Sequence, residues 1–215
     1  MTEIIVNADW RVLLIGGNSG VGKTFIAREL VRPLGISFIM ADDIRIALQQ
    51  ATTAVQNPNL HVFLEYQEAQ WQQPESILRD WITVANEMIK PLQAIMAHHI
   101  FVEEAGRLII EGDSILPALA HQQTFRNAYD SDDVSIEEKI QALFVIEDNE
   151  EKILSNLRQR DRGISAVSGK QQAAFARASA LYGRWLAQEA RHNQLPVLPA
   201  EPRENIMERV LKVIT

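Results

Sequence analysis

Short apolar runs alternate with stretches of helical spacing along most of this chain. Five apolar runs bounded by polar or turn residues predict strands, at about residues 11–15, 36–40, 107–113, 142–146 and 195–198. Runs that are apolar at nearly every position suit strands buried on both faces of a sheet. Apolar residues at helical spacing follow at about 25–32, 149–157, 171–191 and 205–213. Because strands alternate with helices, the pattern predicts a five-stranded parallel sheet with helices on both faces.

One region departs from this alternation. Residues 52–105 show helical spacing only, with Pro74 placed as a first-turn proline and Pro91 expected to kink or restart the helix. We therefore expect one domain, 1–215, with a helical substrate lobe inserted at 52–105. Another helix is expected to begin within residues 114–120, and the acidic residues 130–138 are expected to form a loop.

The first predicted strand leads into a glycine-rich segment that opens the first predicted helix. The segment is Gly17, Asn18, Ser19, Gly20, Val21, Gly22, Lys23 and Thr24. Gly, four residues and then Gly-Lys-Thr between a strand and a helix is the P-loop pattern, whose backbone N–H groups surround phosphates. Lys23 would reach the β- and γ-phosphates of a nucleotide, and the Thr24 hydroxyl would bind Mg²⁺. The alternative, a glycine-rich turn without a ligand, fits the strand–helix context less well.

Composition narrows the functional classes. The 215 residues are 47% hydrophobic and 23% charged, as in ordinary globular proteins, and the formal net charge of −7 argues against bulk nucleic-acid or anionic-membrane binding. The absence of cysteine excludes disulfides, thiolate catalysis and cysteine-based zinc sites. No apolar run reaches the length of a membrane span, so we expect a cytoplasmic enzyme with access to ATP.

The chain resembles P-loop kinases of the nucleoside-monophosphate-kinase-like group over nearly its whole length. The segments 42–45 (Asp-Asp-Ile-Arg) and 110–117 (Ile-Glu-Gly-Asp-Ser-Ile-Leu-Pro) are similar to segments of the 2-phosphoglycerate kinase family. The first is also similar to zeta-toxin and chloramphenicol-phosphotransferase-type kinases. Two departures leave the acceptor open: Asp113 stands where the family usually has an apolar residue, and Ser114 where it often has His. The resemblance implies an α/β, P-loop NTPase three-layer sandwich that uses ATP and Mg²⁺, with an Arg-rich lid at 158–169.

Four polar residues at predicted strand ends are the candidates for binding the acceptor. Asp42 is the candidate general base for the acceptor hydroxyl, and the alternative is a helix cap. Arg45 would grip an anionic group of the acceptor, or form a surface ion pair. Glu111 and Asp113 would hold Mg²⁺ (Glu111 first) or orient the acceptor, or they are ordinary strand-end carboxylates. Ligands of such sheets bind at the carboxyl ends of the strands, where Asp42, Glu111 and Asp113 lie, with Arg45 one turn inside the helix that follows.

A basic segment and a proline-flanked loop complete the set of candidates. Arg158, Arg160 and Arg162 could close positive charge over the transferring phosphoryl group, or form a solvated turn. In the kinases that this chain resembles, the loop that corresponds to the one containing Pro202 borders the adenine. The alternative is a loop that only connects the last strand to the closing helix. Trp71, Trp81 and Trp185 are expected to pack in the core or the lobe, although a tryptophan in the cleft could stack on a substrate ring.

Together these residues predict an ATP-dependent phosphotransferase that acts on a hydroxyl of a small molecule resembling 2-phosphoglycerate. The first alternative is a nucleotide-binding switch protein without an acceptor. The second is a kinase of a nucleotide-sugar, as the zeta-toxin likeness allows. The chain contains no Asn-Lys-x-Asp motif, which is the motif that specifies guanine, so ATP is favoured over GTP.

Overall fold

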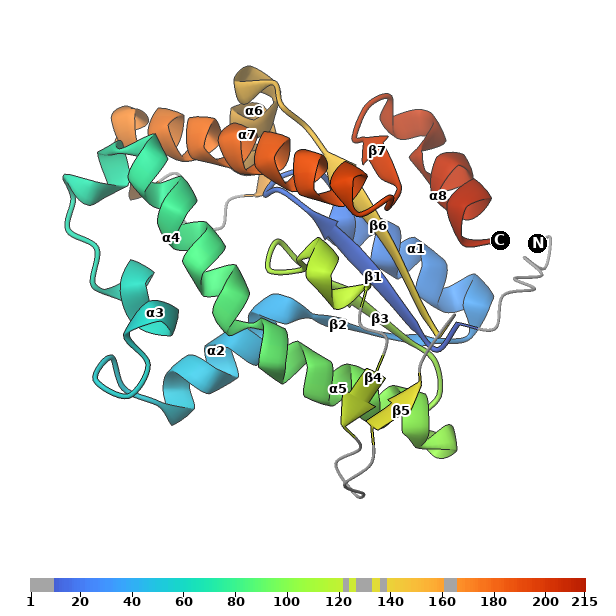
Figure 1. The fold of residues 1–215 in the computed structure, drawn as a ribbon. Coiled ribbons are helices and arrows are strands. Elements are labelled where there is room, and N and C mark those ends of the chain that lie inside the picture. The colour runs from blue at the N-terminus through green and yellow to red at the C-terminus, as the bar shows by residue number, and fades with distance from the viewer. Residues whose placement is uncertain (1–9, 122–123, 127–132, 136–138, 161–165) are drawn as a thin grey trace.

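A five-stranded parallel sheet forms the centre of the molecule. The computed structural model describes residues 10–121, 124–126, 133–135, 139–160 and 166–215 (Figure 1). The strand order is β2-β3-β1-β6-β7, and every neighbouring pair is parallel. The strands are β1 (Val12–Gly17), β2 (Ser37–Met40), β3 (Leu108–Glu111), β6 (Ile140–Ile146) and β7 (Val197–Pro199). All five strands predicted from the sequence are present, and the predicted parallel sheet is confirmed.

Helices cover both faces of the sheet, which gives three layers (Figure 1). Val12 and Leu14 of β1 pack with helices α4 (Pro74–Glu87), α5 (Ile89–Phe101) and α7 (Gly169–His192). Leu13 and Ile15 face the other way and pack with helices α1 (Lys23–Leu34) and α8 (Ile206–Ile214). Successive residues of a strand point to opposite faces, so a strand covered on both sides must be apolar throughout. This is the reason why the continuous apolar runs were reliable strand signals.

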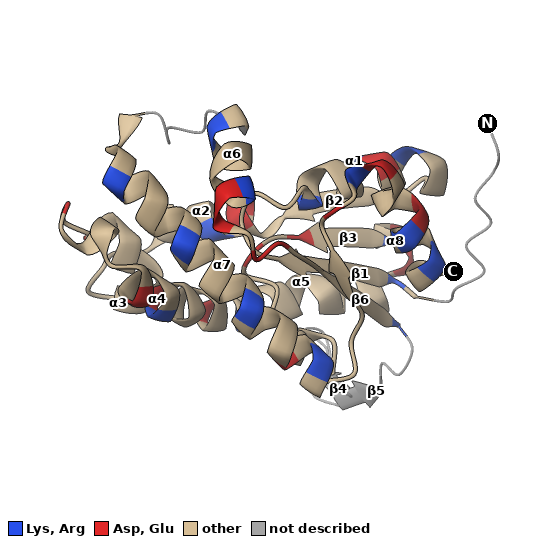
Figure 2. Ribbon diagram, turned by 90° about the horizontal axis from the view of Figure 1, so that it is seen from above, with Lys and Arg blue, Asp and Glu red and all other residues tan. Residues whose placement is uncertain are grey.

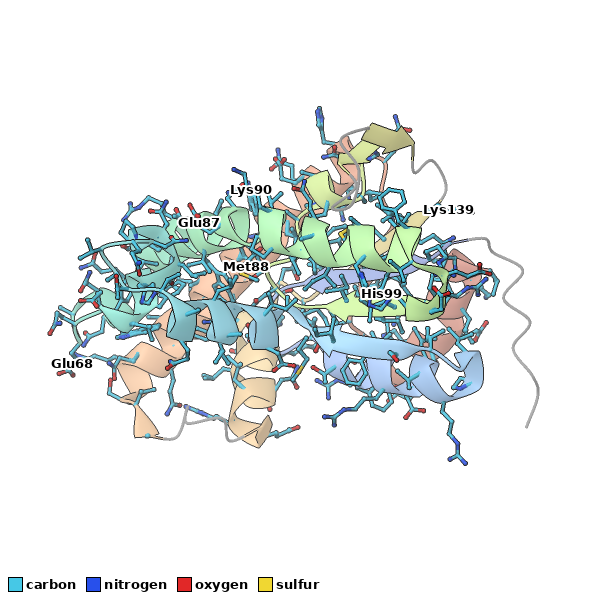
Figure 3. The ribbon with its side chains drawn as sticks, turned by 90° about the horizontal axis from the view of Figure 1, so that it is seen from below. Glu68, Glu87, Met88, Lys90, His99 and Lys139 are labelled. Atoms are coloured by element: carbon cyan, nitrogen blue, oxygen red, sulfur yellow. The ribbon has the colours of Figure 1, made fainter. Side chains whose placement is uncertain are left out.

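The chain between β2 and β3 is helical, as predicted. Helix α2 (Ala41–Ala51) begins directly after β2 and is followed by α3 (Pro58–His61), by 3₁₀ turns at Val62–Leu64 and Gln70–Gln72, and by α4 and α5. Helix α4 ends at Glu87 and α5 begins at Ile89, with Pro91 in its first turn, which confirms the expected restart. Figure 3 shows Met88 at this junction, where its side chain is fully buried.

Two expectations outside the main sheet are wrong. Residues 114–120 do not begin an α-helix: only a 3₁₀ turn, Pro117–Leu119, forms, because Leu116 is extended before the proline and Ile115 is held in the core. Residues 133–135, expected to lie in a loop, form strand β5 (Asp133–Ser135), which pairs antiparallel with β4 (Thr124–Arg126). The acidic residue Asp133 disfavours a strand locally, and backbone pairing overrides this preference.

Helix α6 (Glu150–Arg160) then follows β6. No helix in the described ranges is long and apolar enough to cross a membrane.

Candidate active site

The P-loop joins the carboxyl end of β1 to the first turn of α1. Helix α1 begins at Lys23, and its N-cap residue, Gly22, has a φ of 97°, which L side chains rarely adopt. A Cβ atom on Gly22 would meet nothing within 4 Å, so its backbone conformation, rather than lack of space, is what calls for glycine. The space around Gly22 and the N-terminus of α1, whose dipole favours an anion, together form a cradle suited to a phosphate.

Buried side chains hold this loop in place. Asn18 is fully buried, and its Nδ2 donates to the Glu147 carbonyl oxygen (2.9 Å) at the end of β6 while its Oδ1 accepts from the Glu147 backbone N–H (3.2 Å). The same Nδ2 donates to Ser179 Oγ (3.2 Å) on α7. The approach of α7 is close: a Cβ atom on Gly183 would lie 2.9 Å from Asn18 Cγ. Asn18 is therefore a structural anchor of the loop, which a P-loop consensus does not reveal.

Lys23 and Thr24 place a cation and a hydroxyl at the carboxyl edge of the sheet. Lys23 Nζ donates to the Asn18 carbonyl oxygen (2.9 Å), and Thr24 Oγ1 donates to Glu111 Oε1 (2.8 Å) at the end of β3. A hydroxyl and a carboxylate are the hard oxygen donors that Mg²⁺ prefers. In the described part of the chain, no three His, Cys, Asp or Glu side chains gather as a metal cage. Mg²⁺ at phosphoryl-transfer sites needs only one or two protein ligands besides phosphates and water, so this pair fits it.

Asp42 and Asp113 come together because α2 packs tightly against the end of β3. A Cβ atom on Gly112 would lie 2.7 Å from the Ala41 Cβ, so only glycine allows this approach. Burial, and then the negative charge of Asp42, raise the pKa of Asp113 to about 6. The predicted meeting of strand-end carboxylates is thus present. Figure 2 shows further acidic residues close by, in the loop that leads into α6 and in the first turn of that helix.

Arg45 is engaged with Asp42. Its Nε and Nη2 donate to Asp42 Oδ1 (3.3 and 3.1 Å), and its Nη1 donates to Gln49 Oε1 (3.2 Å). Gln49 is buried, and its Nε2 donates to the Leu60 carbonyl oxygen (2.8 Å), which fixes this group of side chains against the inserted lobe. The N-cap of α2 is Met40, so Asp42 lies inside the helix and is not its cap. The arrangement leaves the Asp42 carboxylate oriented by Arg45.

Two cavities reach the P-loop at adjacent residues. The first, which we call the P-loop pocket, has a volume of about 530 Å³. It is lined by Gly20, Val21, Gly22, Phe25, Ile26, Asn156, Gln159, Ala200, Arg203, Glu204 and Ile206. The second, which we call the aromatic pocket, has a volume of about 380 Å³. It is lined by Ser19, Asp42, Arg45, Phe63, Trp71, Trp81, Val84, Asp113, Ser114 and Phe175.

The remaining predicted residues lie outside the two pocket linings. Pro202 does not line the P-loop pocket, although Ala200 and Arg203 of the same loop do. The Arg158 side chain is exposed, and its Nε donates to Gln172 Oε1 (2.8 Å) on α7. Arg162 lies outside the described residues, so the lid remains a prediction.

Sequence reasoning missed several residues that line the pockets. Phe63 and Phe175 in the aromatic pocket, and Phe25 and Arg203 in the P-loop pocket, were not candidates. The two pocket phenylalanines stand at spacings that also suit a buried core, so no sequence signal separates these roles. Trp81 belongs to the core and Trp71 packs against it, as expected, and both side chains also line the aromatic pocket.

Comparison with known proteins gives the same fold. No family model matches the chain. A 2-phosphoglycerate kinase from Pyrococcus horikoshii is 34% identical over 110 residues, which are 49% of this chain and only 36% of that protein. The structure of a gluconokinase from Sinorhizobium meliloti aligns with 97% of this chain and 93% of its own, with a TM-score of 0.52 and 9% identity. A shikimate kinase from Bacteroides thetaiotaomicron aligns over 94% of both chains, with a TM-score of 0.49 and 16% identity. The gluconokinase alignment, together with the parallel sheet, shows that the chain has the α/β fold of P-loop kinases.

Proposed function

We propose that this protein is an ATP-dependent phosphotransferase that moves the γ-phosphoryl group of MgATP to a hydroxyl group of a small molecule. One observation supports this most strongly: two separate cavities reach the same P-loop, one at Ser19 and one at Gly20. A reaction between two bound substrates requires them to meet at one point, and the P-loop is where transferable phosphates bind. A switch protein has no need for the second pocket, which favours the kinase over that alternative.

The P-loop pocket is the proposed nucleotide site. Backbone N–H groups of the loop and Lys23 would hold the phosphates, and the base would lie along Phe25, whose ring is 55% exposed. The loop containing Pro202 would border the base. Thr24 and Glu111 would hold Mg²⁺, which supplies neutralisation of phosphate charge when it is bound.

The aromatic pocket is the proposed acceptor site. The acceptor hydroxyl oxygen would attack the γ-phosphorus, the bond from that phosphorus to the ADP oxygen would break, and the hydroxyl proton would pass to the Asp42 carboxylate. Arg45 would keep that carboxylate in position through its two hydrogen bonds. Lys23 would stabilise the charge on the transferring group.

The segment 158–169 is proposed as a lid that closes over the phosphates, with Arg158 and Arg162 supplying the positive charge. Helix α6 contacts the P-loop, since Asn156 Nδ2 donates to the Gly20 carbonyl oxygen (3.1 Å). Arg158 follows two residues later in the same helix and is exposed, so a movement of the following segment could bring positive charge to this edge. The inserted region 52–105 supplies Phe63, Trp71 and Trp81 to the aromatic pocket and is proposed as the lobe that selects the acceptor.

The test is release of ADP from MgATP in the presence of a panel of alcohols. The panel includes 2-phosphoglycerate, which the name of the partial relative suggests, with sugars, nucleosides, nucleotide-sugars and antibiotics. Turnover that depends on an acceptor is expected, and Lys23→Ala should lower it by about 10³-fold or more. Lys212→Ala, a change of an exposed lysine on α8 that pairs only with Glu208 in the described structure, is the matched control and should leave the rate unchanged. ATP hydrolysis that no acceptor stimulates, or a Lys23→Ala variant with normal turnover, would overturn the proposal.

A further inference from the structure

The aromatic pocket has two walls of stacked rings. Phe63 and Trp71 lie nearly parallel on one side, with centroids 5.6 Å apart and an interplanar angle of 20°. Tyr66 meets both rings edge-on, at 5.1 and 4.9 Å. Because each ring is in contact with two others, this wall is rigid before any ligand arrives.

The second wall comes from α4 and α7. Trp81 and Phe175 lie with centroids 5.3 Å apart, and Trp81 also stacks on Tyr182 at 5.1 Å and an interplanar angle of 3°. The Tyr182 hydroxyl donates to the Asp113 carbonyl oxygen, which ties this wall to the carboxylate edge. Four aromatic side chains thus line one cavity of about 380 Å³. A cavity of that size with rigid aromatic walls suits a flat ring better than a short acyclic acid.

The charges in this cavity are unfavourable for an anion. Its charged lining residues are Asp42, Asp113 and Arg45. Arg45 directs its Nε and Nη2 at Asp42 and its Nη1 at Gln49, and its positive charge is paired with the Asp42 carboxylate, so an anionic ligand would compete with Asp42 for it. At the neighbouring P-loop edge, Lys23 and Glu111 carry opposite charges, so they add no net positive charge. Lys23 is also the residue proposed to bind the nucleotide phosphates. An acceptor with a phosphate and a carboxylate would therefore enter next to two carboxylates and an anionic nucleotide, with no uncommitted arginine among the lining residues.

We propose that the acceptor is an alcohol that carries a flat ring and no anionic group, with its ring between the two aromatic walls and its hydroxyl at the carboxylate edge. This inference rests on the proposed kinase function and specifies its acceptor. It differs from the acceptor that the partial sequence relative suggests, because 2-phosphoglycerate has two anionic groups and no ring.

The experiment compares uncharged ring-bearing acceptors with anionic ones. One pair is thymidine and thymidine 3′-monophosphate, which share the base and the 5′-hydroxyl and differ by one phosphate. Chloramphenicol, an uncharged aryl alcohol, is compared in the same assay with 2-phosphoglycerate. Acceptor-dependent ADP release should have a kcat/KM at least about tenfold higher for the uncharged compound of each comparison, because the phosphate must be desolvated beside carboxylates.

A variant of the aromatic wall tests the stacking. Trp71→Leu should raise KM for the ring-bearing acceptor by about 5- to 100-fold, as expected for the loss of one stacking side chain, while KM for MgATP stays unchanged. Trp185→Leu is the matched control, since Trp185 adjoins Tyr182 but does not line the pocket, and its acceptor KM should change by less than about twofold. An equal effect of both changes would indicate a structural role only and overturn the stacking assignment.

The outcomes separate the acceptor class from the kinase function. Efficient phosphorylation of 2-phosphoglycerate, with little turnover of ring-bearing alcohols, would overturn this inference and leave the proposed function intact. If no compound stimulates ADP release, the kinase proposal is in question, and binding of the same compounds is read from tryptophan fluorescence with ADP present. A fluorescence change with the uncharged ring compounds that is lost in Trp71→Leu supports the inference. No change with any of them overturns it.

Discussion

The P-loop pocket and the aromatic pocket reach the same loop but are built in different ways. The P-loop pocket is lined by three consecutive P-loop residues, Gly20, Val21 and Gly22, and in the proposed nucleotide site the loop would bind phosphates mainly through backbone groups. The aromatic pocket takes side chains from the P-loop, α2, the turns that follow α3, α4, the end of β3 and α7. A pocket made of backbone restricts which residues are allowed, whereas a pocket made of side chains can change its ligand through single substitutions.

This difference assigns separate tasks to the two pockets. Under the proposed function, phosphate binding would depend on the conformation of Gly22 and on the first turn of α1, which a sequence can specify locally. Acceptor choice would depend on rings that are brought together by the packing of the inserted region against α7. The comparison predicts that changes in one pocket leave the other functional, and each prediction below tests that separation.

The largest effect in the aromatic pocket is expected from Asp42→Asn. Asparagine keeps an oxygen that can accept from Arg45, so the geometry of the pocket should persist, but it cannot take a proton from the acceptor. We expect kcat to fall by about 10²- to 10⁴-fold while the Kd for MgATP stays unchanged. Steady-state kinetics with the best acceptor and nucleotide binding by calorimetry measure the two quantities.

Asp43→Asn is the matched control for Asp42→Asn. Asp43 is the next residue of α2 and its side chain is exposed, so its substitution should leave kcat within about twofold. Equal losses of kcat in the two variants would mean that the reaction depends on negative charge in the first turn of α2 and not on a base at Asp42. A tenfold weaker MgATP affinity in Asp42→Asn would show that the pockets are not separate.

A smaller effect, on the other pocket, is expected from Gly183→Ala on α7. The added methyl group would lie 2.9 Å from the buried Asn18 side chain, whose amide is fixed by hydrogen bonds at both ends. Either α7 or the P-loop must move, which should cost about 1–3 kcal/mol of unfolding free energy and weaken MgATP binding. Chemical denaturation and nucleotide titration report the two effects.

Gly169→Ala, at the first residue of the same helix, is the control for this change. A Cβ atom there would meet nothing within 4 Å, and alanine has the higher helix propensity, so stability should stay the same or rise by up to about 1 kcal/mol. If Gly183→Ala were as stable as the parent protein and bound MgATP normally, the anchoring role of Asn18 would be refuted.

Much of the fold was predictable because the central strands, β1, β3 and most of β6, are buried on both faces. Residues such as Leu13 and Leu14 point to opposite cores, and only a run that is apolar throughout satisfies both. The hairpin of β4 and β5 was not predictable, since three-residue strands with an acidic residue show no periodic signal. The segment 114–120 was misread because Pro117 suits the first turn of a helix, and nothing local reports that Leu116 is extended and Ile115 is buried in the core.

The parts of the candidate site that are set by neighbouring residues in the sequence were predictable, and the parts that are set by packing between distant elements were not. The P-loop follows from its spacing, and the meeting of Asp42 with Asp113 follows from topology, because neighbouring parallel strands end at the same edge. The engagement of Arg45 with Asp42 was one of two readings that the sequence left open. The aromatic walls were beyond prediction, since Phe175 on α7 has the spacing of a core residue and nothing local indicates a cavity.

The smallest expected effect concerns the stability of the ligand-free aromatic pocket, through Asp113→Asn. The pKa of Asp113 is raised to about 6 from an ordinary value of 3.8, so the folded state holds this proton more tightly than the unfolded state. The favourable contribution of the protonated carboxyl is therefore full below about pH 4 and is lost as the pH rises through 6. At pH 7.5 the ionised carboxylate destabilises the fold, and Asn should be more stable by about 1 kcal/mol, a value reduced from the full shift because Asp113 is only partly buried.

The measurement is urea unfolding of the parent and Asp113→Asn from pH 4 to pH 8, with EDTA present so that no cation offsets the carboxylate. The gain from Asn should be greatest above pH 6.5 and should shrink toward zero as the pH falls to 4, because the protonated Asp and Asn are then both neutral. Asp43→Asn, which removes an exposed charge, should show no such pH-dependent gain. A gain that is independent of pH, or a loss of stability at pH 7.5, would contradict the prediction. The predicted gain would show that this edge of the aromatic pocket keeps a carboxylate at the expense of stability, as is common where a residue serves binding or catalysis.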